Sequence, residues 1–245
     1  MNTLARSRNM PFWDHLEELR WCLIKSIFSI LIFTIYCYLN WEYFLDILLK
    51  PSQKLNLNLN FQVLKITSIF IIKISCSILL GLIFSIPVVL YQIWSFVNPA
   101  LNEKFRLNIY FLTTLSLFFF IIGLCFGFFI IIPFSLDFFS SMIDNSLTIA
   151  YNVTLDNYLY FVLWLSLLCG MIFQLPVISI YMSKIGLFTP EFLRHYRKHS
   201  YLFFLVLGAI LTPPDPLSQI AIGIPLIILY EISILISLFY NKNHE

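Results

Sequence analysis

Long apolar runs, separated by short charged or proline-containing segments, dominate the pattern of this chain. They predict six transmembrane helices, over residues 21–39, 74–94, 107–136, 157–183, 200–211 and 218–240. The first four runs are each long enough to cross about 30 Å of hydrocarbon at ~1.5 Å per residue. The pattern therefore predicts an all-α, polytopic membrane protein with a single membrane domain, preceded by a cis-side surface segment over residues 1–20.

Prolines shape these predicted helices and the segments between them. Pro87 and Pro176 lie inside the second and fourth runs, where a missing N–H and a bulky ring should kink or break the helix. The fifth run gives only roughly 18 Å of helix before the prolines of residues 212–216 stop it. We therefore expect the last two helices to be short, to form a hairpin, and to lie in a locally thinned membrane. Residues 40–73 are expected to form a sizeable loop with short amphipathic pieces.

Composition and charge support the membrane assignment. Of the 245 residues, 60% are hydrophobic and 11% are charged, whereas a soluble domain has about 25% charged residues. Lys and Arg accumulate on the cytoplasmic side of membrane proteins, and all but Lys50, Lys54, Lys65 and Lys73 of the 15 lie in the cis segments. Both termini are therefore predicted on the cis side. The net charge of +2, without a basic stripe, argues against a nucleic-acid partner.

No combination of residues in the sequence indicates an enzyme. A nucleophile, a base and an orienting group cannot be assembled, and the four histidines lack the spacing of zinc or haem ligands. The cysteines are each isolated in apolar surroundings. We therefore expect no enzymatic activity, no metal and no cofactor, and a function based on recognition or on passage through the membrane.

An acidic, amphipathic segment precedes the first predicted span. Residues 11–20 place apolar side chains at Phe12, Leu16 and Leu19, beside three acids and a histidine. This pattern predicts a helix on the membrane surface. Such a helix can be a simple anchor, but acids clustered on the positive-inside face also suit a cationic ligand.

Three motifs, in one order along nearly the whole chain, resemble those of the TatC family, the signal-peptide receptors of twin-arginine protein translocation. Residues 15–20 (His-Leu-Glu-Glu-Leu-Arg) are similar to the family's N-terminal His-Leu-x-Glu-Leu-Arg motif, and residues 91–101 to its first cytoplasmic loop. Residues 212–219, with Pro225 and residues 229–231, are similar to its last turn and last helix. The resemblance implies a concave helical bundle that recognises signal peptides with two adjacent arginines. It also implies transport of folded proteins driven by the proton-motive force.

The resemblance further implies a site for the two arginines. Guanidinium groups form their strongest pairs with carboxylates. Glu18 matches the family's N-terminal carboxylate, and Glu17 is the second candidate for the same role. Where the family commonly has a second glutamate this chain has Phe105, so Glu103 could replace that glutamate only if the local backbone differs. The predicted signal-peptide site comprises His15, Glu17, Glu18, Arg20, Phe96, Pro99, Leu101 and Glu103.

Two polar residues fall within predicted spans. Glu231 would cost about 2.5 to 3.5 kcal/mol if charged at the bilayer centre, so it should face a cavity, find a partner or stay protonated; a buried, hydrogen-bonded acid is the alternative interpretation. Gln174 matches the family's polar position on the concave face, where it could meet a partner helix or a signal peptide.

The trans-side loops are expected to hold Pro51, Pro213, Pro214 and Asp215. Their residue types alone indicate turns, and the resemblance implies that these loops shape the cavity.

The expected partners are twin-arginine signal peptides of folded cargo and single-span subunits of the TatA and TatB type, in a homo- or hetero-oligomer. A proton- or ion-coupled solute transporter that uses Gln174 and Glu231, and an assembly subunit of a respiratory complex, are the alternatives. Transporters usually show internal repeats, and we find none between the two halves. The AT-rich residue skew favours the mitochondrial inner membrane, while a plastid thylakoid or a bacterial plasma membrane fits the same physics.

Overall fold

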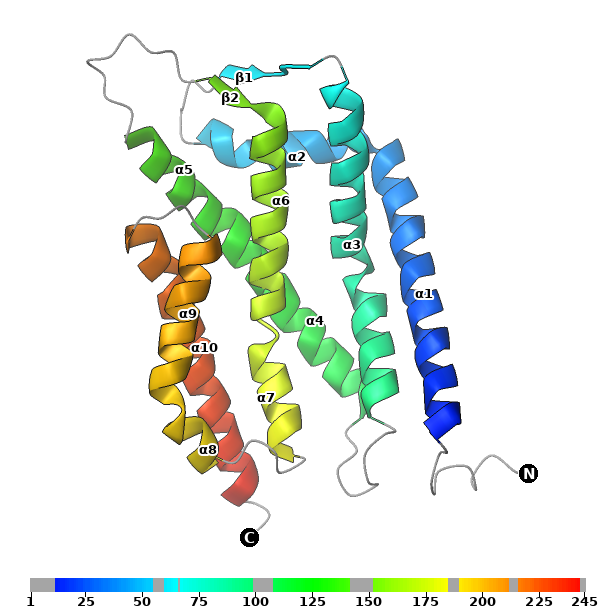
Figure 1. The fold of residues 1–245 in the computed structure, drawn as a ribbon, viewed down its shortest axis with the longest axis vertical. Helices are drawn as coiled ribbons and strands as arrows, with labels where there is room; N and C mark the ends of the chain where they lie inside the picture. Colours follow the sequence, from blue (N-terminus) through cyan, green and yellow to red (C-terminus); the bar gives the residue numbers. More distant parts are fainter. Residues whose placement is uncertain are drawn as a thin grey trace.

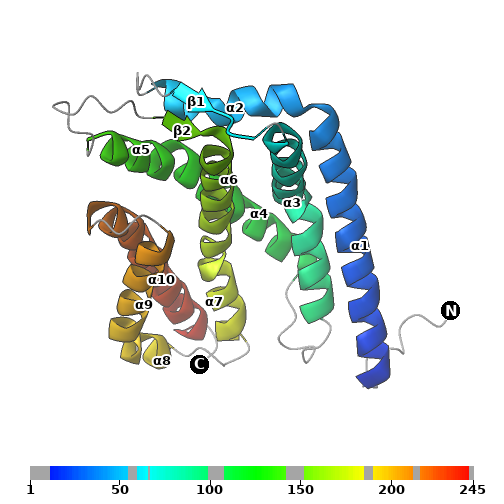
Figure 2. The same ribbon diagram turned by 45° about the horizontal axis from the view of Figure 1, so that its top comes forward.

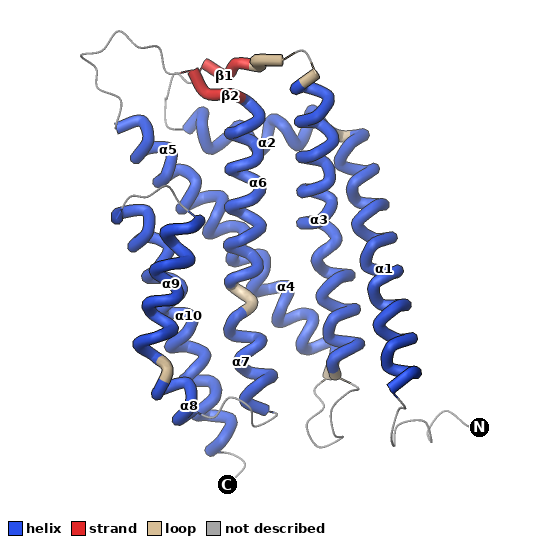
Figure 3. The backbone as a smooth tube through the Cα atoms, in the orientation of Figure 1, coloured by secondary structure: helices blue, strands red, loops and turns tan. Residues whose placement is uncertain are grey.

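Helices make up nearly all of the described chain (Figures 1 and 3), and the predicted all-α class is confirmed. The computed structural model describes residues 12–54, 60–65, 67–98, 108–141, 152–184, 190–211 and 216–242. The elements in chain order are α1 (Phe12–Leu39), α2 (Trp41–Lys54), β1 (Asn60–Gln62), α3 (Ser68–Val97), α4 (Ile109–Phe126), the π-helical turn η2 (Gly127–Ile131), α5 (Ile132–Ser141), β2 (Asn152–Thr154), α6 (Leu155–Ile172), α7 (Leu175–Lys184), α8 (Pro190–His195), α9 (Arg197–Leu211) and α10 (Pro216–Lys242). The two short strands pair in parallel, with Asn60 opposite Asn152.

Four helical segments of the described chain are long and apolar enough to cross a membrane. They are His15–Leu39, Ser68–Val97, Ile109–Ser141 and Leu155–Ser183. The third comprises α4, η2 and α5, and the fourth comprises α6 and α7. The fourth is the most buried and the first is the least buried, so α6 and α7 lie in the middle of the bundle and α1 at its edge (Figure 1).

The hairpin of α9 and α10 completes the bundle. Helix α9 has 15 residues, or about 22 Å, and is short as predicted. Helix α10 has 27 residues and is not short in sequence, because it continues without a break through Pro225 and on to Lys242. The hairpin nevertheless stops well before the end of the bundle where α2, β1 and β2 lie (Figures 1 and 2).

Helix α1 corrects the prediction of a separate surface helix over residues 11–20. The described helix begins at Phe12 and continues without interruption to Leu39. No glycine or proline separates the acidic segment from the apolar run, and Leu, Glu and Arg favour helix. At 28 residues, or about 42 Å, α1 exceeds the hydrocarbon thickness of about 30 Å. Its first turns therefore exceed the length that a span needs and continue it in one helix.

The prolines singled out in the sequence differ in whether they interrupt a helix. At Pro176 the fourth run is broken as predicted, because α6 ends at Ile172 and α7 begins at Leu175. Pro87 lies within α3 without ending it. Pro51 also lies inside a helix, since residues 41–54 form the continuous helix α2, one of the amphipathic pieces expected within residues 40–73.

Small residues let the main helices approach closely. A Cβ atom at Gly81 of α3 would lie 2.3 Å from the Thr34 side chain and 2.7 Å from the Thr34 backbone in α1. A Cβ atom at Gly123 of α4 would lie 2.9 Å from the Cα atom of Gly170 in α6. Helix contacts of this kind replace the hydrophobic driving force that is missing inside a lipid bilayer.

Candidate functional site

The start of α1 and the end of α3 meet at the end of the bundle where α7 and α10 also end (Figure 1). The His15 ring stacks on the Phe96 ring, with centroids 4.2 Å apart and planes 12° apart. The structure therefore brings together residues from two motifs that lie about eighty positions apart in the sequence.

Glu18 lies on the same side of α1 as His15, one turn later. The Nδ1 atom of His15 is 3.6 Å from Oε2 of Glu18, and the two side chains are 31% and 39% exposed. This distance is too long for a hydrogen bond, and Oε2 is covered without a hydrogen-bond partner. A carboxylate oxygen left unsatisfied is costly, so a cationic donor that reorients the Glu18 carboxylate would be bound favourably.

Glu17 and Arg20 form a separate pair. Arg20 donates to Glu17 Oε1 over 3.4 Å, and the two side chains are 63% and 62% exposed for Glu17 and Arg20 respectively. The Arg20 guanidinium also lies 5.6 Å from the ring centre of Trp21. Exposed pairs of this kind contribute about 0–1 kcal/mol. Glu17 therefore already has a cation beside it, whereas Glu18 does not have an arginine or lysine partner among the described residues.

Several predicted site residues cannot be placed beside this group. The predicted site residues of the cis loop and of the last trans loop lie outside the described residues: Pro99, Leu101, Glu103, Pro213, Pro214 and Asp215. Phe105, which stands where the family commonly has a second glutamate, lies outside them too. Pro51, expected in a trans-side loop, is buried in the last turn of α2.

Gln174 lies at the break between α6 and α7, where its side chain reaches α4. Its Nε2 atom donates to the backbone carbonyl of Ser116 over 2.9 Å. The hydroxyl of Ser116 in turn accepts from the indole N–H of Trp94 over 2.8 Å, and the Trp94 ring packs 4.9 Å from the Tyr181 ring. Ser116 thus connects α3, α4 and the break between α6 and α7, a role that the sequence did not indicate.

Glu231 has a partner inside the bundle. Arg197, the first residue of α9, donates to Glu231 Oε2 over 2.6 Å, and the hydroxyl of Tyr201 donates to Oε1. The side chains of Arg197 and Glu231 are 40% and 34% exposed. Of the outcomes expected for Glu231, the structure thus favours an ion pair. The basic cluster before the predicted fifth span contains Arg197, but no sequence pattern distinguishes it from the other basic residues there.

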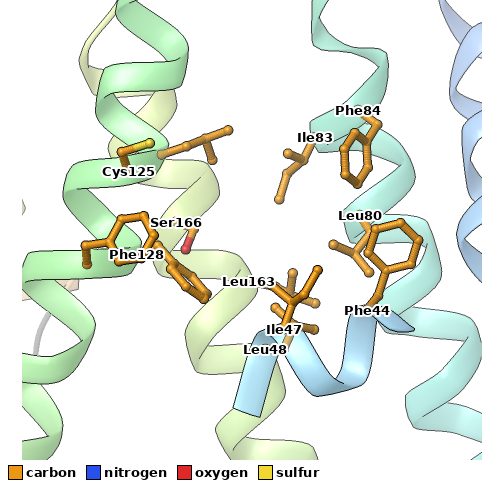
Figure 4. Close-up of a pocket in the computed structure, with 12 residues that line it drawn as sticks. Phe44, Ile47, Leu48, Leu80, Ile83, Phe84, Cys125, Phe128, Leu163 and Ser166 are labelled. Atoms are coloured by element: carbon orange, nitrogen blue, oxygen red, sulfur yellow. The ribbon is translucent and has the colours of Figure 1, made fainter. Parts of the chain in front are cut away.

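An apolar pocket of about 280 Å³ opens between α3 on one side and α4, η2 and α6 on the other. Figure 4 shows Phe84 and Ile83 of α3 facing Cys125 and Phe128 across it, with α2 at its end. Ser166 is the single polar residue of its lining, and its hydroxyl donates to the Val162 carbonyl. The lining of the pocket is therefore apolar enough to hold a hydrocarbon chain or an apolar side chain.

Ligands for a metal ion do not converge within the described segments. No group of three or more His, Cys, Asp or Glu residues there is arranged to hold one, and the five cysteines are free. The described polar features are the Glu18 carboxylate beside the stacked rings of His15 and Phe96, and two separate groups within the helices. One group is centred on Gln174 and the other on Glu231.

Comparison with known proteins identifies the family. The family model of the Sec-independent protein translocase protein (TatC) matches residues 14–225. The chain is 33% identical to the Sec-independent protein translocase protein TatCy of Bacillus subtilis, covering 96% of this chain and 91% of that protein. It is 36% identical to TatC of Carboxydothermus hydrogenoformans, covering 94% and 93%. It is also 36% identical to the uncharacterized tatC-like protein ymf16 of Reclinomonas americana, covering 92% and 86%.

A solved structure agrees with these sequence matches. The crystal structure of a twin arginine translocase receptor, TatC, superposes with a TM-score of 0.79 at 34% identity, covering 92% of this chain and 98% of that one. The same receptor in the detergent DDM gives a TM-score of 0.80. The family model, the similar relatives and the matching crystal structure together place this chain in the TatC family of Sec-independent protein translocase proteins.

Proposed function

We propose that this chain is the subunit of a twin-arginine translocase that binds twin-arginine signal peptides at the junction of α1 and α3. The proposal rests chiefly on the stacking of His15 on Phe96, which joins the second motif to a histidine whose Nδ1 atom lies 3.6 Å from the Glu18 carboxylate. Family membership supports the translocase role, and a receptor of this kind needs no catalytic group. Transport of folded proteins would then use the proton-motive force.

Glu18 is the residue we assign to the first arginine of the signal peptide. A bound guanidinium would supply the hydrogen bonds that Oε2 of Glu18 lacks, and charge-assisted pairs are about twice as strong as neutral ones. Glu17 is less suited, because Arg20 already neutralises it. Arg20 and Trp21 would flank the peptide at the membrane surface, and the loop residues Pro99, Leu101 and Glu103 remain our proposal for the second contact.

Photo-crosslinking tests the location of this site. With a photoreactive residue at Phe96, the purified protein should capture a peptide with two adjacent arginines and should not capture the same peptide with two lysines. A photoreactive residue at Trp164, which is 55% exposed on α6, is the matched control and should capture neither. Equal capture of the arginine and lysine peptides at Phe96 would contradict the proposal.

We also propose that single-span subunits of the TatA and TatB type bind this protein within the membrane, and that both termini face the cis side. The start of α1 and the end of α10 lie at the same end of the bundle, where α8 lies and α9 begins (Figure 1). The first half of α1 carries Arg20 and Lys25, α8 carries Arg194, and Lys198 is the second residue of α9, in accord with the positive-inside rule. A solute transporter is less well supported, because Glu231 pairs with Arg197 and Gln174 with Ser116, so the two do not share a site.

For the compartment, we propose the mitochondrial inner membrane. The basis is the excess of residues that AT-rich codons encode, such as 26 Phe against 7 Gly. Neighbouring genes for respiratory subunits would support this assignment, and a bacterial chromosomal context would contradict it.

A further inference from the structure

The end of α8 and the start of α9 carry a basic surface that the proposed function does not use. Arg194, His195, Lys198 and His199 are all exposed there. None of the four forms an ion pair with another residue of the described chain. Glu191, the acid nearest to them in the sequence, lies in the first turn of α8 and does not pair with them either. The surface therefore offers unpaired cations to a ligand.

Helical spacing continues across the boundary between α8 and α9. The backbone N–H of Tyr196 donates to the Phe192 carbonyl over 3.1 Å, and the N–H of Ser200 donates to the Tyr196 carbonyl over 3.0 Å. Side chains four positions apart on a helix are neighbours, with Cβ atoms about 5 to 6 Å apart. Arg194 and Lys198 therefore lie side by side, close enough for both to contact one phosphate group.

A group of rings lies next to these cations. The ring centroid of Tyr196 is 4.6 Å from that of Phe192, 5.2 Å from that of His195 and 5.8 Å from that of His199. Phe192 and Tyr196 are 43% and 42% exposed. Exposed aromatic rings are typical of the level of the lipid headgroups in membrane proteins, so this surface combines features that suit both parts of a lipid.

Contacts with α10 hold the surface in place. The hydroxyl of Tyr230 donates to the carbonyl of Leu193 over 2.8 Å, and the Leu193 side chain is 4% exposed. Arg197 is bound to Glu231 of α10, so its charge is already neutralised. The remaining cations of the turn are thus displayed on a fixed backbone.

The short hairpin should bring lipid headgroups close to this surface. Helix α9 has 15 residues, or about 22 Å, which is less than the hydrocarbon thickness of about 30 Å. Helix α10 continues from Glu231 to Lys242, about 16 Å further, and Figure 1 shows it extending past α8. A span shorter than the bilayer thins the bilayer locally. Headgroups beside α9 should therefore approach Arg194 and Lys198.

We propose that Arg194 and Lys198 bind the phosphate of an anionic phospholipid in the cis leaflet, with the rings of Phe192 and Tyr196 beside its glycerol and acyl chains. Charge complementarity favours a headgroup with net negative charge, because the amine of a zwitterionic headgroup offsets its phosphate. The bound lipid would stabilise the short α9–α10 hairpin in a thinned membrane. The leaflet follows from the proposed orientation, whereas the lipid site is separate from the signal-peptide site at Glu18.

Photo-capture of lipids tests this site. The protein carries a photoreactive aromatic residue at Phe192, in vesicles with equal amounts of phosphatidylglycerol and phosphatidylcholine that have the same acyl chains. Mass spectrometry identifies the captured lipid. Each nearby cation favours an anionic lipid by about fivefold, so the anionic lipid should be captured about tenfold more often or better. The same residue at Phe118 of α4, which is 58% exposed, is the matched control and should capture the two lipids about equally.

Variants locate the preference that is measured at residue 192. Arg194→Gln and Lys198→Gln should each lower it by about threefold or more, and the double variant should abolish it. Arg194→Lys, which keeps the charge, should retain most of it. Lys25→Gln removes an exposed cation of α1 and should leave the preference unchanged.

Three results would overturn the proposal. Equal capture of the two lipids at residue 192 would leave this surface to the general charge bias of membrane proteins. A preference that survives in the double variant would place the anion elsewhere. Loss of the preference with added inorganic phosphate, but not with chloride at the same ionic strength, would assign Arg194 and Lys198 to a soluble phosphate in place of a lipid.

Discussion

The ion pair of Arg197 and Glu231 predicts that substitution of one partner lowers the stability of the protein more than substitution of the other. Arg197→Gln leaves the Glu231 carboxylate without its cation about 16 Å from the end of α10 at Lys242. Glu231→Gln leaves Arg197 at the first position of α9, where its long side chain can extend to the headgroups. We therefore expect Arg197→Gln to be the more destabilising of the two.

The magnitudes follow from depth and exposure. A charged acid at the centre of a transmembrane helix costs about 2.5 to 3.5 kcal/mol, and removal of one partner of a fully buried pair costs about 3 to 5 kcal/mol. Glu231 is 34% exposed and Arg197 is 40% exposed, which lowers both figures. We expect about 1 to 3 kcal/mol for Arg197→Gln and under about 1 kcal/mol for Glu231→Gln, whose amide still accepts from Tyr201.

Buried thiols provide the assay. Cys37, Cys76 and Cys169 are 0 to 3% exposed, so a thiol-reactive dye that labels them reports unfolding of the purified protein in detergent. Cys22 and Cys125 are more accessible and are replaced by Ser in every sample. The midpoint temperature of labelling should fall further for Arg197→Gln than for Glu231→Gln.

The double variant completes the cycle. Arg197→Gln with Glu231→Gln removes both charges, so it should be more stable than Arg197→Gln alone, with an interaction free energy of about 1 kcal/mol or more. Equal effects of the single substitutions, or effects that simply add, would refute the argument that the pair neutralises a membrane-embedded carboxylate.

Three further predictions concern packing and topology. Gly81→Ala should destabilise the contact of α1 with α3 by about 1 to 3 kcal/mol, because the new methyl group meets the Thr34 backbone at 2.7 Å; unchanged dye labelling of Cys37 on heating would contradict this. Tyr158→Phe removes the 2.9 Å hydrogen bond to the carbonyl of Leu48 and should cost about 1 kcal/mol, seen as faster amide exchange in α2, whereas equal exchange would count against it. Tags at the two termini should be digested together by protease from one face of oriented vesicles, and protection of only one tag would rule out a shared side.

Sequence reasoning succeeded where the signal was local. Apolar length identified the four long spans, the missing N–H of Pro176 marked the break after α6, and the short run before Leu211 identified α9. It failed at the start of α1, where the acidic and apolar patterns suggested two separate elements. The acidic segment contains no glycine or proline to end a helix, so the helix that begins at Phe12 continues into the span.

The polar contacts were beyond sequence reasoning for a different reason. Arg197 and Glu231 are 34 residues apart, and Gln174 and Ser116 are 58 residues apart. Each pair forms only after two helices dock in one register, and several basic residues near Arg197 carry the same charge. The stacking of His15 on Phe96 is similar, since motif order alone does not reveal which side chains touch.

Binding of a twin-arginine signal peptide to Glu18→Ala and Glu17→Ala, side by side, tests the central claim most directly. Both side chains lie on the surface part of α1, so each loss should change the free energy of unfolding by only a few tenths of a kcal/mol. Loss of a charge-assisted contact to arginine should instead cost about 1.5 to 3 kcal/mol of affinity, which is tenfold or more. We predict that Glu18→Ala weakens binding tenfold or more while Glu17→Ala leaves it within about threefold. Unchanged binding of the arginine peptide to Glu18→Ala would contradict the account.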